Sequence, residues 1–167
     1  LHEWKVSTAR AREIQLSLAK RVVTENGVIN PRLVAGIDIS SPDAQGTARG
    51  AVVVLSYPEF SIIEIEIAQG KITMRYIPGL LSFRESPLIL DACEKLSNIP
   101  DLVLIDGQGI AHPRRLGLAS HVGLFLEFGK NQSDSLPLWQ FLDSTPHNMR
   151  LSLPLDHRLG RVRVGRH

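Results

Sequence analysis

Three strand-length segments follow one another in the chain and are separated only by short turns. The first, residues 33–40, is an apolar run with a single acid, and the second, residues 47–56, contains consecutive valines. The third, residues 61–68, alternates isoleucine with glutamate, as a half-buried strand near a sheet edge does. Strands joined by such short turns pair antiparallel, so we expect a three-stranded meander whose second strand is buried on both faces.

Helical patterns surround this meander. Residues 8–24 carry apolar side chains at helical spacing, residues 87–96 follow a capping Ser86, and residues 115–128 form a third helical stretch. Residues 101–105 are a fourth strand, which is reached through a helix and is therefore expected to lie parallel to the first. The expected fold class is α/β, a mixed sheet with flanking helices.

Composition suits one globular domain, with 43% hydrophobic and 22% charged residues among 167. The longest apolar run is too short to span a membrane, the first residues contain no signal core, and Cys93 is the single cysteine. We therefore expect a cytoplasmic monomer without a membrane partner. Since periodicity fades after residue 128, we assign residues 1–128 to the domain and residues 129–167 to a poorly ordered basic tail.

The charge distribution argues against a generic basic DNA-binding surface. Residues 150–167 contain five arginines against one aspartate, so the remainder of the chain is net negative although the whole carries +2. A nucleic acid would have to be held by local cations and by metal.

Two acids occupy unusual places on the expected strands. Asp38 lies inside an apolar strand and Asp106 ends another. If these strands are parallel neighbours, both acids emerge at one end of the sheet, where a cation between them would relieve their repulsion. Glu85 can supply a third oxygen, and such all-oxygen sites suit Mg²⁺ or Mn²⁺. The alternative is that each aspartate caps a turn or helix, while Glu85 favourably charges a helix N-terminus.

Four motifs resemble those of the endonuclease V family, the deoxyinosine 3′-endonucleases, in order and spacing over residues 8–128. They are VAGIDIS (34–40), YIPGLLSFRE (76–85), DGQG (106–109) and HPRRLGLASHVG (112–123). The resemblance implies a ribonuclease H-like fold and a DNA repair enzyme that cuts the second phosphodiester bond 3′ to deoxyinosine. Inosine-containing RNA is the alternative substrate, because family members differ in this preference.

The resemblance also implies a role for each matched residue. The catalytic metal site would consist of Asp38, Glu85 and Asp106 with Mg²⁺ or Mn²⁺, and His112 would act beside the scissile strand. The segment Tyr76, Ile77 and Pro78 would be a wedge that holds the duplex open. Backbone at Gly79, Leu81 and Gly107, with Leu118, would form the base pocket; phosphate contacts would come from Arg114, Arg115 and His121.

The sequence departs from the family pattern after residue 128. A strand ending in a lysine near the active site, and a later Pro-Gly-His segment, are both absent from this stretch. A frameshift, a truncated form or a splice variant would each explain the change. We expect an incomplete fold with an unpaired sheet edge, low stability and weak or absent cleavage. A catalytically weakened binder of inosine-containing nucleic acid and a non-functional product therefore remain alternatives.

Overall fold

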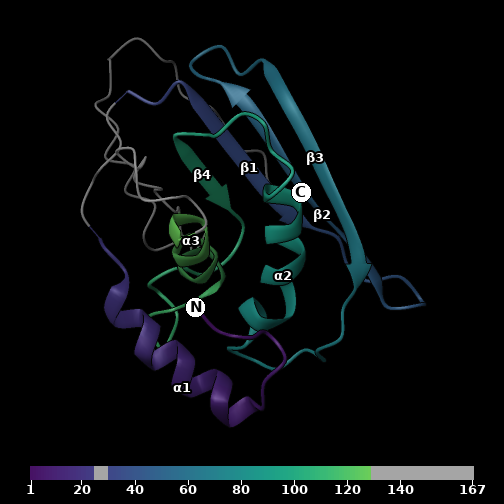
Figure 1. Ribbon diagram of the computed structural model, residues 1–167, viewed down its shortest axis with the longest axis vertical. Coiled ribbons are helices and arrows are strands. Elements are labelled where there is room, and N and C mark those ends of the chain that lie inside the picture. Colours follow the sequence, from purple (N-terminus) through teal and green to yellow (C-terminus); the bar gives the residue numbers. More distant parts are fainter. Residues whose placement is uncertain (25–29, 129–167) are drawn as a thin grey trace, which may run out of the picture.

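The computed structural model describes residues 1–24 and 30–128, so the expectation for the tail lies outside the described residues. A four-stranded sheet with the order β3-β2-β1-β4 forms the centre (Figure 1). The strands are β1 (Leu33–Ile39), β2 (Thr47–Ser56), β3 (Ile62–Lys71) and β4 (Leu102–Ile105). The first three pair antiparallel, and β4 pairs parallel with β1, which confirms the mixed sheet.

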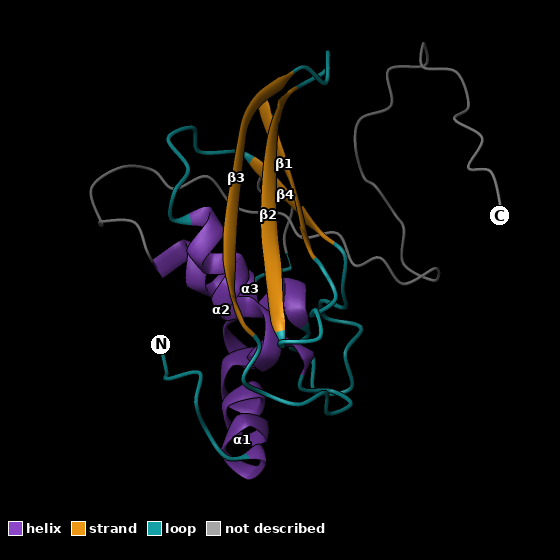
Figure 2. Ribbon diagram, turned by 90° about the vertical axis from the view of Figure 1, so that its right-hand side faces the viewer, coloured by secondary structure: helices purple, strands orange, loops and turns teal. Residues whose placement is uncertain are grey.

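The helices α2 and α3 cover one face of the sheet, and α1 lies beyond its lower end (Figure 2). The helical elements are α1 (Thr8–Leu18), the 3-10 turn η1 (Ala19–Arg21), α2 (Leu81–Cys93) and α3 (Leu118–Phe128). One apolar cluster joins the sheet to α2 and α3, and a second joins α1 to α2 and α3. None of the helices in the described part of the chain has the length and apolarity needed to cross a membrane.

Several helix boundaries differ from the sequence prediction. Helix α3 begins at Leu118 and not at residue 115, and α2 ends at Cys93 and not at residue 96. The first helix ends at Leu18, passes through η1, and is already extended at Val22, where β-branched residues disfavour the helix. The helix predicted from Pro87 begins instead at Leu81, so Pro87 lies inside α2. Ser86 is therefore not an N-cap, and its buried hydroxyl oxygen has no hydrogen-bond partner.

The burial of the sheet also differs from the prediction. In β2, Val52 and Val54 are fully buried, whereas Val53 between them is partly exposed, because the helices among the described residues cover only one face. The expectation of burial on both faces was wrong. The edge position of β3 is confirmed, but its glutamates face the helical side while Ile65, 50% exposed, lies opposite Val53 on the open face.

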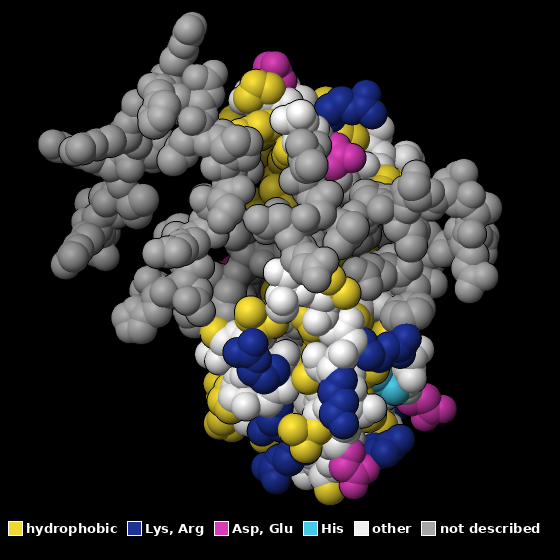
Figure 3. All heavy atoms as spheres, turned by 90° about the vertical axis from the view of Figure 1, so that its left-hand side faces the viewer, with side chains coloured by type: hydrophobic (Ala, Val, Ile, Leu, Met, Phe, Trp, Pro, Cys, Tyr) yellow, Lys and Arg dark blue, Asp and Glu magenta, His cyan; other side chains and the backbone are white. Residues whose placement is uncertain are grey.

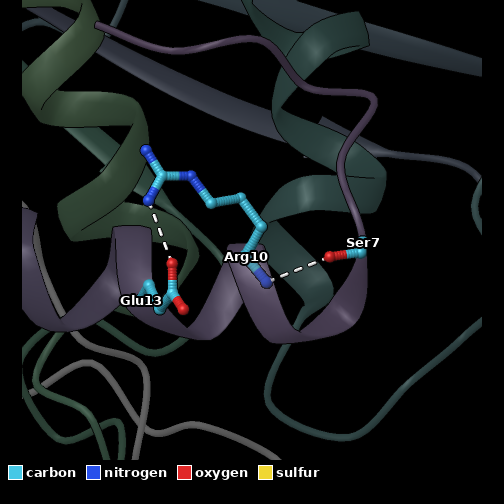
Figure 4. Close-up of polar contacts among 3 residues, drawn as sticks. All are labelled: Ser7, Arg10 and Glu13. Carbon is cyan, nitrogen blue, oxygen red and sulfur yellow. Dashed lines mark hydrogen bonds and ion pairs between the residues drawn. The ribbon is translucent and has the colours of Figure 1, made fainter.

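Helix α1 begins with a side-chain cap. The Ser7 hydroxyl accepts a hydrogen bond from the Arg10 amide at 3.2 Å, and an exposed ion pair joins Arg10 to Glu13 at 3.0 Å (Figure 4). The cap satisfies an amide that has no intrahelical partner, whereas an exposed ion pair at this spacing contributes only a few tenths of a kcal/mol.

The Ser7→Ala variant is expected to lower the free energy of unfolding by about 1 kcal/mol, the usual loss for removal of an N-cap. Urea unfolding monitored by circular dichroism measures this change. Ser17→Ala, at an exposed position late in the same helix, is the matched control and should have little effect. Equal stability of the two variants would contradict the capping role.

Candidate metal and nucleic-acid site

The two strand aspartates lie at the same end of the sheet. The parallel register pairs Val34 with Leu102 and Ile37 with Ile105, so Asp38 and Asp106 come next on their two strands. Adjacent strands are roughly 4.8 Å apart, which makes these acids close neighbours. Both side chains are exposed.

Asp101 aligns these two strands, although the sequence prediction gave it no role. Its carboxylate oxygen Oδ2 accepts the amides of Arg32 at 2.8 Å and Leu33 at 3.0 Å. Its own amide donates to the Leu33 carbonyl at 2.8 Å. Because these bonds fix the starts of β1 and β4, they also set Asp38 opposite Asp106 further along. The only sequence signal was an aspartate directly before an apolar strand.

Glu85 lies in the first turns of α2 and is partly buried. Burial raises the pKa of its carboxyl group, the negative charge of Asp38 raises it further, and the neighbouring Arg84 opposes both effects. The negative charge of Asp38 therefore disfavours ionisation of Glu85, with a smaller effect than burial or Arg84. A cation between them would relieve that repulsion.

The donor set fits a hard divalent cation in chemistry, since all three side chains offer carboxylate oxygens. The parallel register makes Asp38 and Asp106 neighbours, and the charge of Asp38 acts on the pKa of Glu85. Within residues 1–24 and 30–128, no three His, Cys, Asp or Glu side chains converge closely enough to hold a metal ion. One Asp38 oxygen accepts the Ile39 amide at 2.8 Å.

A hollow of about 280 Å³ connects the acidic end of the sheet with the segment before α2. Its lining includes Glu85, Leu81 and Tyr76, one residue from each of the predicted metal, base-pocket and wedge groups. Ile39 and Ser40, which follow Asp38 in the chain, also line it. The fold thus brings one residue from each of the three predicted groups to a single concave surface.

The predicted wedge residues differ in exposure. The Tyr76 side chain is 64% exposed, and Pro78 is exposed as well. Ile77 packs against the apolar cluster beneath α1, and its carbonyl accepts the Leu80 amide at 2.9 Å. The segment therefore presents an aromatic ring to solvent while Ile77 anchors it.

Two residues predicted to act on the phosphate strand converge on the Gly79 carbonyl. His112 Nδ1 accepts the Arg114 amide at 3.1 Å, so the neutral ring carries its proton on Nε2 and donates to the Gly79 oxygen at 3.1 Å. The Arg114 guanidinium donates to the same oxygen at 2.6 Å. His112 is buried, and burial, followed by the Arg114 charge, lowers its pKa despite the Gly79 hydrogen bond.

Gly79 has a φ of 77°, and a β-carbon at this position would lie 2.6 Å from the Arg114 guanidinium. Gly107 is less tightly packed, since a β-carbon there would lie 3.1 Å from the side chain of Leu118. Arg115 is exposed and also has a positive φ, 59°. The backbone at the two predicted pocket glycines is thus packed against side chains. Gly79 lies against the 112–115 turn, and Gly107 lies against the start of α3.

His121 does not line an open surface, which corrects the expectation that it contacts a phosphate. The side chain has no exposed area in this conformation. Its Nδ1 is 2.8 Å from the Ser82 hydroxyl oxygen, and its Nε2 is 2.8 Å from Nε2 of His2. The ring therefore joins α3 to α2 and to the N-terminal segment, within a group of aromatic side chains.

Stability is expected to fall as the pH drops from about 6.5 towards 3. Burial, followed by the charge of His2, lowers the His121 pKa to about 3, while the unfolded side chain titrates near 6.5. The unfolded state binds more protons in this window, so acidification favours unfolding. Urea unfolding at about pH 7 and pH 4.5 measures how much the free energy of unfolding falls on acidification. This fall should be smaller for His121→Gln than for the parent protein. An equal loss in both would contradict the assignment.

Comparison with known proteins agrees with this arrangement. The family model described as Endonuclease V matches residues 16–129. An Endonuclease V of Dehalococcoides mccartyi is 50% identical over 126 residues, which cover 75% of this chain and 56% of that protein. One from Nostoc punctiforme is 48% identical over 128 residues, which cover 75% of this chain and 58% of that protein. The chain thus spans little more than half the length of these relatives.

Solved structures give the same result. The crystal structure of a Streptomyces avermitilis Endonuclease V matches with a TM-score of 0.69 and 37% identity, covering 74% of this chain and 55% of that one. A single-substitution variant of the Ciona intestinalis Endonuclease V, in complex with a 23mer DNA containing an inosine followed by a ribo-adenosine, matches with a TM-score of 0.64 and 27% identity. The match covers 72% of this chain and 55% of that one.

The mixed sheet, in which three antiparallel strands are joined by a parallel fourth, matches the solved Endonuclease V structures and places the protein in the α/β, ribonuclease H-like class that this family has. Within that class, the chain belongs to the Endonuclease V family.

Proposed function

We propose that this chain recognises a deaminated adenine, inosine, in DNA and cuts the second phosphodiester bond 3′ to it in a reaction that depends on Mg²⁺ or Mn²⁺. The observation that carries the proposal is the hollow that Tyr76, Leu81 and Glu85 line together. It joins a ring that can enter a duplex, backbone that can contact a base, and an acid that can hold metal. Family membership supports the same reaction.

The metal would be held by Asp38, Asp106 and Glu85. When bound, a divalent cation supplies Lewis acidity for hydrolysis of a phosphodiester bond. The protein contributes the positions of the acids, through the Asp101 contacts and the first turns of α2. The raised pKa of Glu85 supports the assignment. Burial and the charge of Asp38 disfavour the ionised carboxylate, and a bound cation would stabilise it.

Recognition of the base would fall to Tyr76 and to backbone groups at Gly79, Leu81 and Gly107. An exposed aromatic ring can replace the stacking lost when a base leaves the duplex. The start of α2 at Leu81 offers helix N-terminal amides, which are hydrogen-bond donors without intrahelical partners. Such donors suit the keto oxygen of hypoxanthine and do not suit the amino group of adenine.

Phosphate contacts would come from cations near the site. Arg115 is exposed, and Arg114 donates through Nη2 to Gly79 and through Nε to Gln15, which leaves the donors of Nη1 for a phosphate. Lys and Arg side chains also gather around the lower part of the described surface, the end where α1 lies (Figure 3). Arg10, Arg12 and Lys20 are exposed there. These residues would attract a nucleic-acid backbone although the body of the chain is not basic overall.

A second candidate function is binding without efficient cleavage. It is favoured by the absence, within the described residues, of three acids converging on one point. The experiment that separates the two measures binding of a duplex with one deoxyinosine in Ca²⁺, followed by cleavage in Mg²⁺. An adenine duplex is the control, and an inosine-containing RNA tests the alternative substrate.

Preferential binding followed by a single 3′ cut supports the nuclease. Preferential binding without a cut supports the binder. No preference for inosine over adenine would refute both.

A further inference from the structure

One polar side chain is buried in the apolar side of α1. Gln15 is only 1% exposed and lies among Ala11, Ile14 and Leu18, which pack into the second apolar cluster. A buried amide is costly unless its donors and acceptor are satisfied. The hydrogen bonds of Gln15 therefore show which groups satisfy its buried amide.

Gln15 forms three hydrogen bonds with two separate segments. Its Nε2 donates to the carbonyl oxygens of Gly79 at 3.1 Å and Leu116 at 3.0 Å. Its Oε1 accepts the Nε–H of Arg114 at 2.7 Å. Both amide protons and the carbonyl oxygen are thus engaged. One side chain ties α1 to the loop before α2 and to the loop before α3.

The Gly79 carbonyl is the centre of this network. It accepts from Gln15, from His112 at 3.1 Å and from Arg114 at 2.6 Å. Three donors on one oxygen fix the peptide plane between Gly79 and Leu80. That plane lies directly between the exposed Tyr76 segment and the first residue of α2. The backbone at the hollow is therefore held by side chains that are distant in sequence.

We propose that Gln15 is a positioning residue for base specificity: it holds the Gly79 loop so that backbone groups beside Tyr76 and Leu81 distinguish inosine from adenine. This inference rests on the proposed function. Hypoxanthine and adenine present opposite donor and acceptor patterns at their six-position, so a rigid backbone rejects the wrong base by leaving polar groups unpaired. A backbone free to shift by a few tenths of an ångström would lose that discrimination.

The test is Gln15→Met in the full chain, which keeps the length of the side chain and removes all three hydrogen bonds. We expect the affinity ratio between deoxyinosine and adenine duplexes, measured in Ca²⁺, to fall by about tenfold or more. Affinity for the adenine duplex should be nearly unchanged. Leu18→Ala, on the same helix and in the same cluster, is the control for lost stability and should keep the parental ratio.

A second variant and a second measurement guard against a folding defect. Gln15→Glu keeps the volume and the contact with Arg114, but at neutral pH it cannot donate to either carbonyl. The affinity ratio between deoxyinosine and adenine duplexes should therefore fall in this variant as well. Native hydrogen exchange over residues 76–81 should accelerate in both Gln15 variants and not in Leu18→Ala.

An unchanged ratio in the Gln15 variants, or an equal fall in Leu18→Ala at the same loss of stability, overturns the inference. A parent protein without inosine preference overturns the proposed function itself, and that failure is distinguishable because it is seen before any substitution.

Discussion

The Asp38→Asn variant is expected to bind Mn²⁺ at least tenfold more weakly than the parent chain, and to lose about 100-fold or more of any cleavage of inosine DNA, since an ionic transition-state contact contributes several kcal/mol. Asp38 is the acid that connects the other two. It lies opposite Asp106 across the parallel strands, and its charge acts on Glu85. Its replacement therefore removes a ligand and the negative potential shared by the site.

Calorimetric titration with Mn²⁺ and single-turnover cleavage of a labelled duplex measure the two effects separately. Asp91→Asn makes the same change in charge at an exposed position on α2, where the side chain lines a different hollow. That control should bind Mn²⁺ like the parent chain. Parental Mn²⁺ affinity in Asp38→Asn would remove Asp38 from the metal site, whatever happens to cleavage.

The same variant has a consequence for Glu85. The negative charge of Asp38 raises the pKa of Glu85, so the neutral asparagine should lower it. A lower pKa means that metal-free Glu85 ionises at lower pH in the variant than in the parent. Carboxyl chemical shifts followed during a pH titration report this difference, and they do so without any catalytic activity.

Local sequence patterns were sufficient for the sheet but not for all of its burial. Short turns determine the antiparallel pairing of β1, β2 and β3, and the long connection through α2 makes β4 parallel to β1. Periodicity alone could not tell which face of β3 the helices cover. On the helical side of β3, Glu64 accepts the amides of Ser97 and Asn98 in the loop after α2, a contact that an isoleucine could not make.

The start of α2 was missed for a local reason. Ser86 followed by Pro87 has the form of a helix N-terminus, since proline is tolerated where amides lack partners. In the structure the helix is already established at Leu81, and packing against α3 and the sheet compensates for the bond that proline cannot donate. Apolar contacts of α2 through Phe83 and Ile89 are tertiary information that the local pattern does not contain.

The polar contacts that organise the site were not predictable from spacing. Gln15 and Gly79 are 64 positions apart, Asp101 and Arg32 are 69 apart, and His2 and His121 are 119 apart. Motifs pointed to Gly79 and to Asp38, but not to the residues that hold them. For the contact between Gln15 and Gly79, the sequence signal was a glutamine among the apolar positions of the first helix.

Removal of the exposed ring at the wedge is the second large effect that we expect. Tyr76→Ala should weaken binding of a deoxyinosine duplex by roughly 5- to 150-fold, the loss that corresponds to about 1–3 kcal/mol for one base–aromatic stack. The ring is 64% exposed, so little folded-state packing is lost with it. The loss should therefore appear in nucleic-acid affinity and not in the unfolding transition.

Fluorescence anisotropy with a labelled duplex in Ca²⁺ measures this affinity. Tyr57→Ala is the matched control, because Tyr57 follows β2 at the opposite end of the sheet from Asp38 and contacts Phe60. Tyr76→Phe keeps the ring and should retain most of the binding, which separates stacking from hydrogen bonding by the hydroxyl group. If Tyr76→Phe loses as much affinity as Tyr76→Ala, the hydroxyl group is the recognition element and the stacking role is wrong.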